Sequence, residues 1–366
     1  MTDGADRSWT YELKRDDLGT SRVVETSLDA LADGEVRLKV SRVGLTANNV
    51  TYAVLGEAFD YWEFFPAADG WGIVPLWGFA DVVESTVAGV DVGSRFYGYY
   101  PAAGHLVVRP GRVDSRGFRD ASKHRENLTS PYNAYALSDT DPLYDVATEE
   151  LQILFRPLYW TSFMFADWII DNRLFGAQSV IISSASAKTA YGTAFELDRK
   201  DVRVIGLTSP GNKDFTAGLG CYDEVFTYDE LDNLPADTPV MLADFTGKQS
   251  LPGTLRDHLG DALVKVAIGG MTNQQSASVG TIDDAGTETA DHPVTFFAPQ
   301  QMRKRFLDWG RDGITDRFAE SWNAFLPVAD TWVTVTVGDG PEGLENAWHD
   351  VYSGHTDPAV GHIISF

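Results

Sequence analysis

The stretch SVIISSASAKTAYGTAF, residues 179–195, predicts a strand that passes through a tight turn into a helix. Residues 180–182 form an apolar β-branched run typical of a buried strand, and a helical pattern begins at Thr189. A phosphate group often binds at such a junction, because a helix N-terminus offers N–H groups and the positive end of the helix dipole. The glycines that usually form this turn are absent. The residue types in the turn must therefore decide what it binds.

The first alternative for this turn is a P-loop. Lys188 and Thr189 would be its closing Lys-Ser/Thr pair, and Asp244, at the end of the run VMLAD, would be the carboxylate linked to magnesium. Ile182 and Ala187, however, stand where the P-loop requires glycine, and a Cβ at the second position obstructs the approach of backbone to phosphate. The P-loop is the weaker alternative.

The second alternative is the turn that binds the pyrophosphate of a dinucleotide. Ser184, Ala187 and Ala190 would occupy its three glycine positions, where small residues can partly substitute because the turn needs close packing and accessible N–H groups. Lys188 would add a positive charge beside the pyrophosphate. A strand–helix turn that binds nothing is the third alternative.

The next strand favours NADP over NAD. In RVIGLTSPGNKDF, residues 203–215, the strand ends at Leu207-Thr208-Ser209 without a carboxylate. A carboxylate there would accept a hydrogen bond from the ribose of NAD, whereas hydroxyls and a cation suit the 2′-phosphate of NADP. Ser209 and Lys213 supply a hydroxyl and a cation, although Lys213 as a solvated helix residue is the alternative.

The N-terminal part of the chain is predicted to be rich in β-strands. Residues 34–43 alternate apolar and polar side chains with the period of a half-buried antiparallel strand. Further strands are predicted in 77–86, 94–105 and 106–110, with Gly and Pro between them. Residues 111–150 are polar and are predicted to form a long excursion.

From residue 151 the period changes, and 151–170 predict a helix. Strands and helices then alternate: strands at 180–183, 202–207, 224–227, 240–245 and 264–269, with helices at 189–197 and 213–220. Such alternation predicts a parallel, doubly wound sheet. Residues 272–292 are predicted to be a loop.

Composition limits the classes of function. The formal net charge of −24 over 366 residues disfavours binding to nucleic acid or to an anionic membrane surface. Cys221 is the single cysteine, which excludes an internal disulfide and a multi-cysteine zinc site. No apolar run is long enough to span a bilayer, and the polar N-terminus is unlike a signal peptide. We therefore expect a cytoplasmic protein.

The chain resembles the medium-chain dehydrogenase/reductase superfamily, on its zinc-free quinone-oxidoreductase and enoyl-reductase side. The segments that carry the resemblance are 34–56, 74–99, 203–230 and 343–366, and the turn after residue 182 falls where the family carries its glycine-rich turn. The departures from the family pattern suggest a divergent subgroup, such as one known only as a domain of unknown function. The resemblance implies an α/β fold made of a β-rich GroES-like catalytic domain and a Rossmann domain with a doubly wound parallel sheet. The expected domains are 1–150, completed by 311–366, and 151–310.

The resemblance also implies site residues. Residues 44–49, GLTANN, lack the family's catalytic zinc ligands, so no metal is expected. The expected catalytic residues are Asn49, Tyr52 and Tyr61. The expected NADPH-binding residues are Ser184, Ala185, Ser186, Ala187, Lys188 and Thr189 at the pyrophosphate, Thr208, Ser209 and Lys213 at the 2′-phosphate, Tyr228 near the adenosine, and Phe245, Thr246 and Gly269 at the nicotinamide half.

We therefore expect an NADPH-dependent, zinc-independent oxidoreductase that transfers hydride to an activated C=C or C=O. The aromatic run FDYWEFF, residues 59–65, is either an apolar pocket wall, which favours a small apolar or aromatic carbonyl or alkene substrate, or plain core. An inactive NADPH-binding sensor or a biosynthetic accessory protein on the same fold is the alternative. Neither nucleic acid nor a membrane is an expected partner, and a homodimer is left open.

Overall fold

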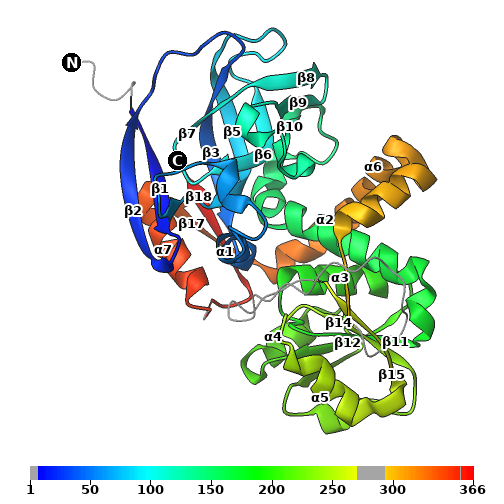
Figure 1. The fold of residues 1–366 in the computed structure, drawn as a ribbon. Coiled ribbons are helices and arrows are strands. Elements are labelled where there is room, and N and C mark those ends of the chain that lie inside the picture. Colours follow the sequence, from blue (N-terminus) through cyan, green and yellow to red (C-terminus); the bar gives the residue numbers. More distant parts are fainter. Residues whose placement is uncertain (1–6, 270–292, 355) are drawn as a thin grey trace. The chain divides into compact units, whose positions relative to one another are not determined.

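The computed structural model describes residues 7–269, 293–354 and 356–366. The chain divides into two compact units (Figure 1), one formed by Met1–Leu154 with Thr334–Phe366 and the other by Phe155–Val333. Residues 311–333, expected to help complete the first domain, thus belong to the second unit. The predicted loop at 272–292 lies outside the described residues.

The first unit contains a large sheet that joins the two ends of the chain. Its strands run in the order β17 (Thr334–Asp339), β18 (Val360–Ser365), β3 (Val36–Leu45), β5 (Pro75–Ser85), β6 (Arg95–Pro101), β10 (Ala134–Leu137), β9 (Gly117–Asp120) and β8 (Pro110–Asp114), and β7 (His105–Val108) also pairs with β3. Only the β17–β18 pair is parallel among these described strands. Figure 1 shows β18, near the C-terminus, beside β3.

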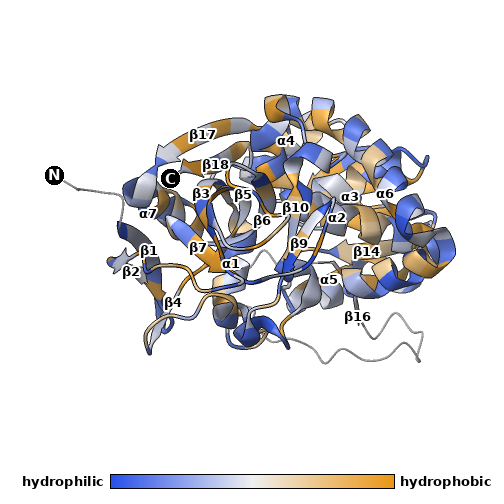
Figure 2. Ribbon diagram, turned by 90° about the horizontal axis from the view of Figure 1, so that it is seen from above, coloured by the Kyte–Doolittle hydropathy of each residue, from blue (hydrophilic) through white to orange (hydrophobic). Residues whose placement is uncertain are grey.

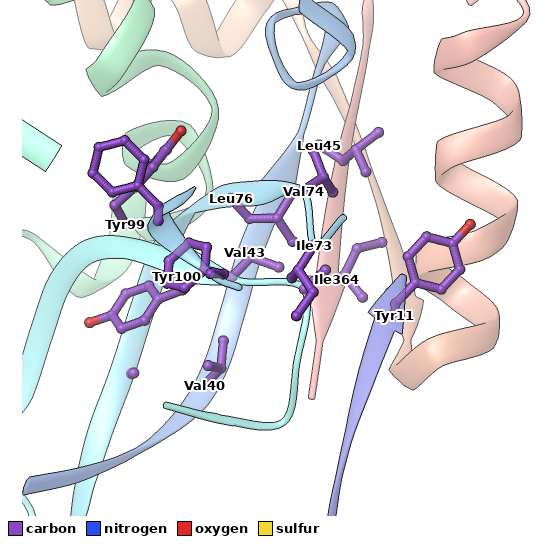
Figure 3. Close-up of a cluster of buried hydrophobic side chains, with 14 of the residues drawn as sticks. Tyr11, Val40, Val43, Leu45, Ile73, Val74, Leu76, Tyr99, Tyr100 and Ile364 are labelled. Atoms are coloured by element: carbon purple, nitrogen blue, oxygen red, sulfur yellow. The ribbon is translucent and has the colours of Figure 1, made fainter. Parts of the chain in front are cut away.

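A second, smaller sheet in this unit has the order β2 (Asp17–Ser27), β1 (Arg7–Lys14) and β4 (Trp71–Gly72). The indole N–H of Trp348, on helix α7 (Gly340–Tyr352), donates to the Leu18 carbonyl of β2 at 2.8 Å. Figure 3 shows the core of this unit, in which buried apolar side chains come from several strands, among them Val43, Leu45, Leu76, Tyr99 and Ile364.

Residues 111–150 are not a strandless excursion, because they contain β9, β10 and all of β8 except its first residue, Pro110. These strands have only four or five residues each, too few to show a period of two among polar neighbours. Two aromatic residues hold the segment in the core. Phe118 of β9 and Tyr135 of β10 are buried and stack with ring centroids 5.0 Å apart.

The second unit is built on a parallel sheet. The strand order is β13 (Glu224–Thr227), β12 (Arg203–Thr208), β11 (Ser179–Ile182), β14 (Val240–Asp244), β15 (Leu263–Ile268) and β16 (Val294–Thr295), with every pair parallel. The helices are α2 (Glu149–Asp171), which begins in the first unit, α3 (Lys188–Asp198), α4 (Lys213–Gly218), α5 (Ser250–Leu259) and α6 (Ala298–Trp332). Strand order reverses between β11 and β14, where doubly wound sheets bind their ligands. The predicted doubly wound sheet is confirmed.

A buried polar cluster explains why the end of α6 belongs to the second unit. The Glu196 carboxylate on α3 accepts hydrogen bonds from the Tyr159 hydroxyl of α2 at 2.5 Å and from the Ser321 hydroxyl of α6 at 2.6 Å. Phe325 of α6 stacks on Tyr159 with ring centroids 4.0 Å apart. Figure 2 shows hydrophobic and hydrophilic residues mixed along α6, as expected for a helix with one buried face.

Helix α6 is interrupted at Gly310, whose φ is 70°. Such a φ favours glycine, and it divides the helix into two segments. Within the described residues, no helix combines the length and apolar character that a membrane crossing requires.

Candidate functional site

The turn between β11 and α3 is tied to the next strand of the sheet through Asp244. The Ser183 hydroxyl donates to Asp244 Oδ1 at 2.5 Å and accepts from the Phe245 N–H at 2.8 Å. The same Asp244 oxygen accepts from the backbone N–H and the hydroxyl of Thr246, both at 2.8 Å. Asp244 is 2 % exposed. It therefore joins the ends of β11 and β14, a structural task that weakens its assignment as a magnesium-linked carboxylate.

Two tyrosine hydroxyls hold the backbone of the turn. The Ser184 N–H donates to the Tyr228 hydroxyl at 2.9 Å, and the Tyr222 hydroxyl donates to the Ala185 carbonyl at 2.9 Å. The Ala185 N–H donates to the Leu207 carbonyl at 3.0 Å. Burial raises the pKa of Tyr228, so its hydroxyl remains protonated near neutral pH. The structure thus places Tyr228 at the predicted turn.

Ser184 takes the left-handed conformation that glycine usually supplies. Its φ is 47°, a region that costs a residue with a Cβ of the order of 1 kcal/mol or more. The small residues that allow close packing lie elsewhere. A Cβ on Gly192 of α3 would lie 2.7 Å from the Ser162 hydroxyl of α2, and one on Gly206 of β12 would lie 3.2 Å from Ala185 Cβ. Neither glycine lies in the turn itself, and no pattern in the sequence marks them as packing positions.

The start of α3 fits an anion. The N-cap residue is Ala187, which makes no side-chain capping bond, so no N-cap oxygen satisfies the amides of the first helical turn. Lys188 is the first residue of this helix and Thr189 the second. A pyrophosphate can accept hydrogen bonds at such a helix end and gain from the helix dipole.

The predicted 2′-phosphate residues lie together at the end of β12, but the cation has an acidic partner. Asn212 Nδ2 donates to the Ser186 hydroxyl at 3.0 Å, and the buried Thr208 hydroxyl lies 3.5 Å from that oxygen. Lys213 Nζ lies 2.8 Å and 2.6 Å from the two carboxylate oxygens of Glu230. The hydrogen bond from Lys213 lowers the pKa of Glu230. Glu230 was not predicted at this site, because it follows a different strand, β13.

Ser209 is exposed and precedes a single 3-10 turn, Pro210–Asn212. Lys248 is a further residue that the sequence analysis missed. Its ammonium lies 5.9 Å from the ring centroid of Tyr228, close enough for a cation–π contact. Lys248 thus adds a positive charge near the tyrosine that holds the turn.

The residues predicted at the nicotinamide half meet at the ends of β14 and β15. The Gly269 N–H donates to the Asp244 carbonyl at 2.9 Å. A Cβ on Gly269 would lie 2.3 Å from the Phe165 ring and 2.9 Å from the Phe245 ring, so this position has no room for a side chain. Phe245, Thr246 and Gly269 are therefore neighbours, and their place at the nicotinamide stays a prediction.

The first unit gathers aromatic residues around Tyr132, which the sequence analysis missed. The Tyr132 ring centroid lies 6.3 Å from that of Tyr52 and 6.0 Å from that of Tyr61. It lies 4.7 Å from that of Tyr99 and 5.8 Å from that of Trp77. Tyr132 lies in the polar segment 111–150, in the short helix Ser130–Asn133, where no sequence pattern marks it. We call these five residues the aromatic cluster.

The hydroxyls of this cluster meet. The Tyr61 and Tyr132 hydroxyl oxygens lie 3.5 Å apart, and the Trp77 indole N–H donates to the Tyr52 hydroxyl at 3.2 Å. Burial raises the pKa of Tyr52, of Tyr61 and of Tyr132, and the hydrogen bond from Tyr132 opposes this rise at Tyr61. All three phenols are therefore protonated near neutral pH and can serve as proton donors.

Asn49 has a different environment from the two predicted tyrosines. Its amide oxygen accepts from the Thr46 N–H at 2.8 Å, and its amide nitrogen donates to the Pro75 carbonyl at 2.9 Å. The side chain is buried and caps helix α1 (Ala47–Val54). These bonds give Asn49 a structural task, and its catalytic role stays a prediction.

Among the described residues, no group of three or more His, Cys, Asp or Glu side chains is arranged to hold a metal ion. The single cysteine, Cys221, is buried, and burial raises its pKa to about 12. A thiolate ligand at this position is therefore disfavoured near neutral pH.

Several solved structures share this fold. CurA from Vibrio vulnificus, solved in complex with NADPH, is 12% identical, with a TM-score of 0.57 and coverage of 94% of each chain. TarJ from S. aureus, also with NADPH, is 9% identical, with a TM-score of 0.57 and coverage of 98% of this chain and 99% of TarJ. The yhdH oxidoreductase from Salmonella enterica, solved with NADP, is 12% identical, with a TM-score of 0.52 and coverage of 98% of this chain and 99% of its own.

These likenesses confirm the expected fold, a β-rich unit joined to a Rossmann unit. No curated protein matches the chain by sequence. One family model, described as a protein of unknown function (DUF2855), matches residues 43–357 and so includes both the aromatic cluster and the turn before α3. The chain belongs to the DUF2855 family.

Proposed function

We propose that the protein is an NADPH-dependent oxidoreductase that reduces an activated C=C or C=O bond without zinc. The observation that carries the proposal is the turn at residues 184–189, which Tyr228 and Tyr222 hold at the reversal of strand order. The similar folds solved with NADPH or NADP support the same proposal.

The second unit would bind the dinucleotide. The start of α3, where the N-cap residue Ala187 has no side-chain cap, and Lys188 would take the pyrophosphate, and the hydroxyls of Ser186 and Thr208 would lie toward the adenosine ribose. The ends of β14 and β15, where Thr246 and Gly269 follow the buried Phe245, would lie toward the nicotinamide half. NADPH, when bound, supplies a hydride.

The reduction also needs a proton, and the aromatic cluster contains candidate donors. Tyr61 is the proposed donor, because it is protonated near neutral pH and only partly buried. Tyr132, whose hydroxyl lies beside that of Tyr61, would stabilise the phenolate that remains after the transfer. Tyr52 receives the Trp77 indole N–H and would hold the cluster in place.

The residue types at positions 44–49 favour a reaction without zinc. Residues 44–49 contain no cysteine or histidine, and Asn49 is engaged in the cap of α1. The partly exposed rings of the cluster, Tyr61, Trp77 and Tyr132, would favour a flat apolar substrate such as a quinone or an aryl enone, since aromatic rings stack on such groups.

A second candidate is a protein that binds NADPH but does not transfer hydride. The observation that favours it is the departure of the turn from the glycine pattern, with Ser184 in a conformation that costs free energy. Its binding properties would match those of the reductase, so only turnover separates the two candidates.

The experiment has two stages. Thermal unfolding of the full chain with and without NADPH tests binding, because a ligand that binds the folded state raises the midpoint. Oxidation of NADPH is then followed at 340 nm with a quinone, an α,β-unsaturated ketone and an enoyl thioester, each with and without a zinc chelator. Turnover that the chelator leaves unchanged supports the reductase. Binding without turnover of any acceptor supports the second candidate, and the absence of binding contradicts both.

A further inference from the structure

We propose that Glu230 sets the cofactor preference of this protein by competing with the 2′-phosphate of NADPH for Lys213. This inference rests on the proposed function, because it concerns the adenosine end of the proposed NADPH site. It assigns a specificity-determining role to a residue outside the turn and outside strand β12.

Glu230 is held in place from both sides. One carboxylate oxygen accepts from the Thr227 N–H at 2.8 Å, and both oxygens lie within 2.8 Å of Lys213 Nζ. The segment that carries Glu230 is itself fixed to β12, because the Tyr228 N–H donates to the Thr208 carbonyl at 3.2 Å. The carboxylate thus lies beside the strand end where the adenosine ribose is expected.

The pair changes the charge that a nucleotide meets. Lys213 alone offers a cation to the 2′-phosphate, but the Lys213–Glu230 pair has no net charge. The lowered pKa of Glu230 means that its carboxylate is ionised throughout the neutral range. A 2′-phosphate carries one to two negative charges, so it must displace the carboxylate from Lys213 or bind against its repulsion.

NADH meets the opposite situation. It carries a 2′-hydroxyl, which can donate a hydrogen bond to a carboxylate, and this is how many NAD sites use an acidic residue. Glu230 therefore reduces the advantage of NADPH and preserves some affinity for NADH. The end of β12 carries no carboxylate, and this alone would predict too strong a preference for NADPH. Glu230, which follows the neighbouring strand β13, supplies a carboxylate at the same place.

The test compares Glu230→Gln with a matched control, Glu224→Gln. Glu224 is the first residue of β13 and pairs with Arg203, which lies at the opposite end of β12 from the expected ribose. Both substitutions remove one carboxylate that is paired with one cation, and both keep the size of the side chain. Affinities of the full-length wild type and variants for NADPH and NADH are measured by calorimetric titration, and thermal unfolding without nucleotide verifies folding.

Glu230→Gln is expected to raise the affinity for NADPH about tenfold and to leave the affinity for NADH unchanged or lower. Glu224→Gln is expected to change neither affinity. An unchanged or weaker affinity for NADPH in Glu230→Gln would overturn the role of Glu230 and leave the proposed function standing. The role of Glu230 is overturned equally if Glu224→Gln shifts the two affinities as much as Glu230→Gln does. If neither dinucleotide binds the wild type or the variants, both the inference and the proposed function fail.

Discussion

The hydroxyl of Tyr228 accepts a hydrogen bond from the backbone N–H of Ser184 at 2.9 Å, although the two residues stand 44 positions apart in the chain. Ser184 adopts a φ of 47° without being glycine. A side chain that follows β13 thus fixes a turn that dinucleotide-binding folds commonly form with glycine. This contact explains how the turn keeps its shape with serine and alanine.

Tyr228→Phe is expected to weaken NADPH and NADH alike by roughly tenfold, because it leaves the Ser184 N–H without its hydroxyl acceptor and loosens the turn. The loss of one such hydrogen bond costs about 1–3 kcal/mol when the partner stays buried. Calorimetric titration measures the affinities. Tyr144→Phe in the first unit, which removes a hydroxyl bonded to Glu149, is the control and should leave both affinities unchanged. Unchanged binding in Tyr228→Phe would show that the contact does not shape the nucleotide site.

Lys188 and Lys213 are expected to act differently on the two cofactors. Lys188→Ala should weaken NADPH and NADH alike, by roughly tenfold, because the pyrophosphate is common to both. Lys213→Ala should weaken NADPH and leave NADH nearly unchanged, because only NADPH carries the 2′-phosphate. Titration of each variant with both dinucleotides provides the comparison. If Lys213→Ala lowers the affinities for NADPH and NADH equally, the assignment of Lys213 to the 2′-phosphate is contradicted.

Tyr61→Phe is expected to lower kcat by about a hundredfold and to change KM little, since general acid catalysis contributes in that range. Tyr132→Phe removes the hydrogen bond that lowers the pKa of Tyr61, so this pKa should rise. Because the donor must be protonated, activity falls as pH increases through its pKa. The alkaline limb of the rate profile should therefore move to higher pH in Tyr132→Phe. If the alkaline limb of the rate profile does not move in Tyr132→Phe, Tyr132 does not influence the proton transfer.

Stability is expected to decrease at alkaline pH partly through Tyr135. Burial raises its pKa to about 12 in the folded chain, against about 10 in an unfolded one. Below pH 10 the full stabilisation is present. Between pH 10 and 12 the unfolded state loses a proton that the folded state keeps, so the free energy of unfolding falls by up to about 1.4 kcal/mol per pH unit. Denaturant unfolding at several pH values measures the slope, which Tyr135→Phe should reduce. If the free energy of unfolding falls with pH equally steeply in the wild type and in Tyr135→Phe, groups other than Tyr135 cause the pH dependence.

The sequence predicted the elements whose residue pattern is strong. The buried runs of β11, β12, β14 and β15 are apolar along their length, so both their existence and their parallel order could be inferred. The short strands β8, β9 and β10 were missed, because pairing with neighbours rather than their own pattern makes them strands. The end of α6 was assigned to the wrong unit, since the bond from Ser321 to Glu196 joins residues 125 positions apart.

Some residues of the candidate site could likewise be predicted from the sequence, and others could not. The turn could be predicted, because a strand, a small-residue turn and a helix are contiguous in the chain, whereas Tyr228 was expected only from the family resemblance. Glu230, Lys248 and Tyr132 could not, because each reaches its neighbours through the fold: Glu230 contacts Lys213 from beyond the end of β13, and Tyr132 contacts Tyr61 from a polar segment. Their roles depend on distances that a linear pattern does not encode.

The measurement that tests the central claim most directly is calorimetric titration of the full-length wild type and of Lys188→Ala with NADPH, and separately with ATP and magnesium. A dinucleotide turn at residues 184–189 predicts that the wild type binds NADPH, that Lys188→Ala binds it roughly tenfold more weakly, and that ATP with magnesium gives no specific heat. Binding of magnesium ATP that Lys188→Ala abolishes, or NADPH binding that Lys188→Ala leaves unchanged, would contradict it.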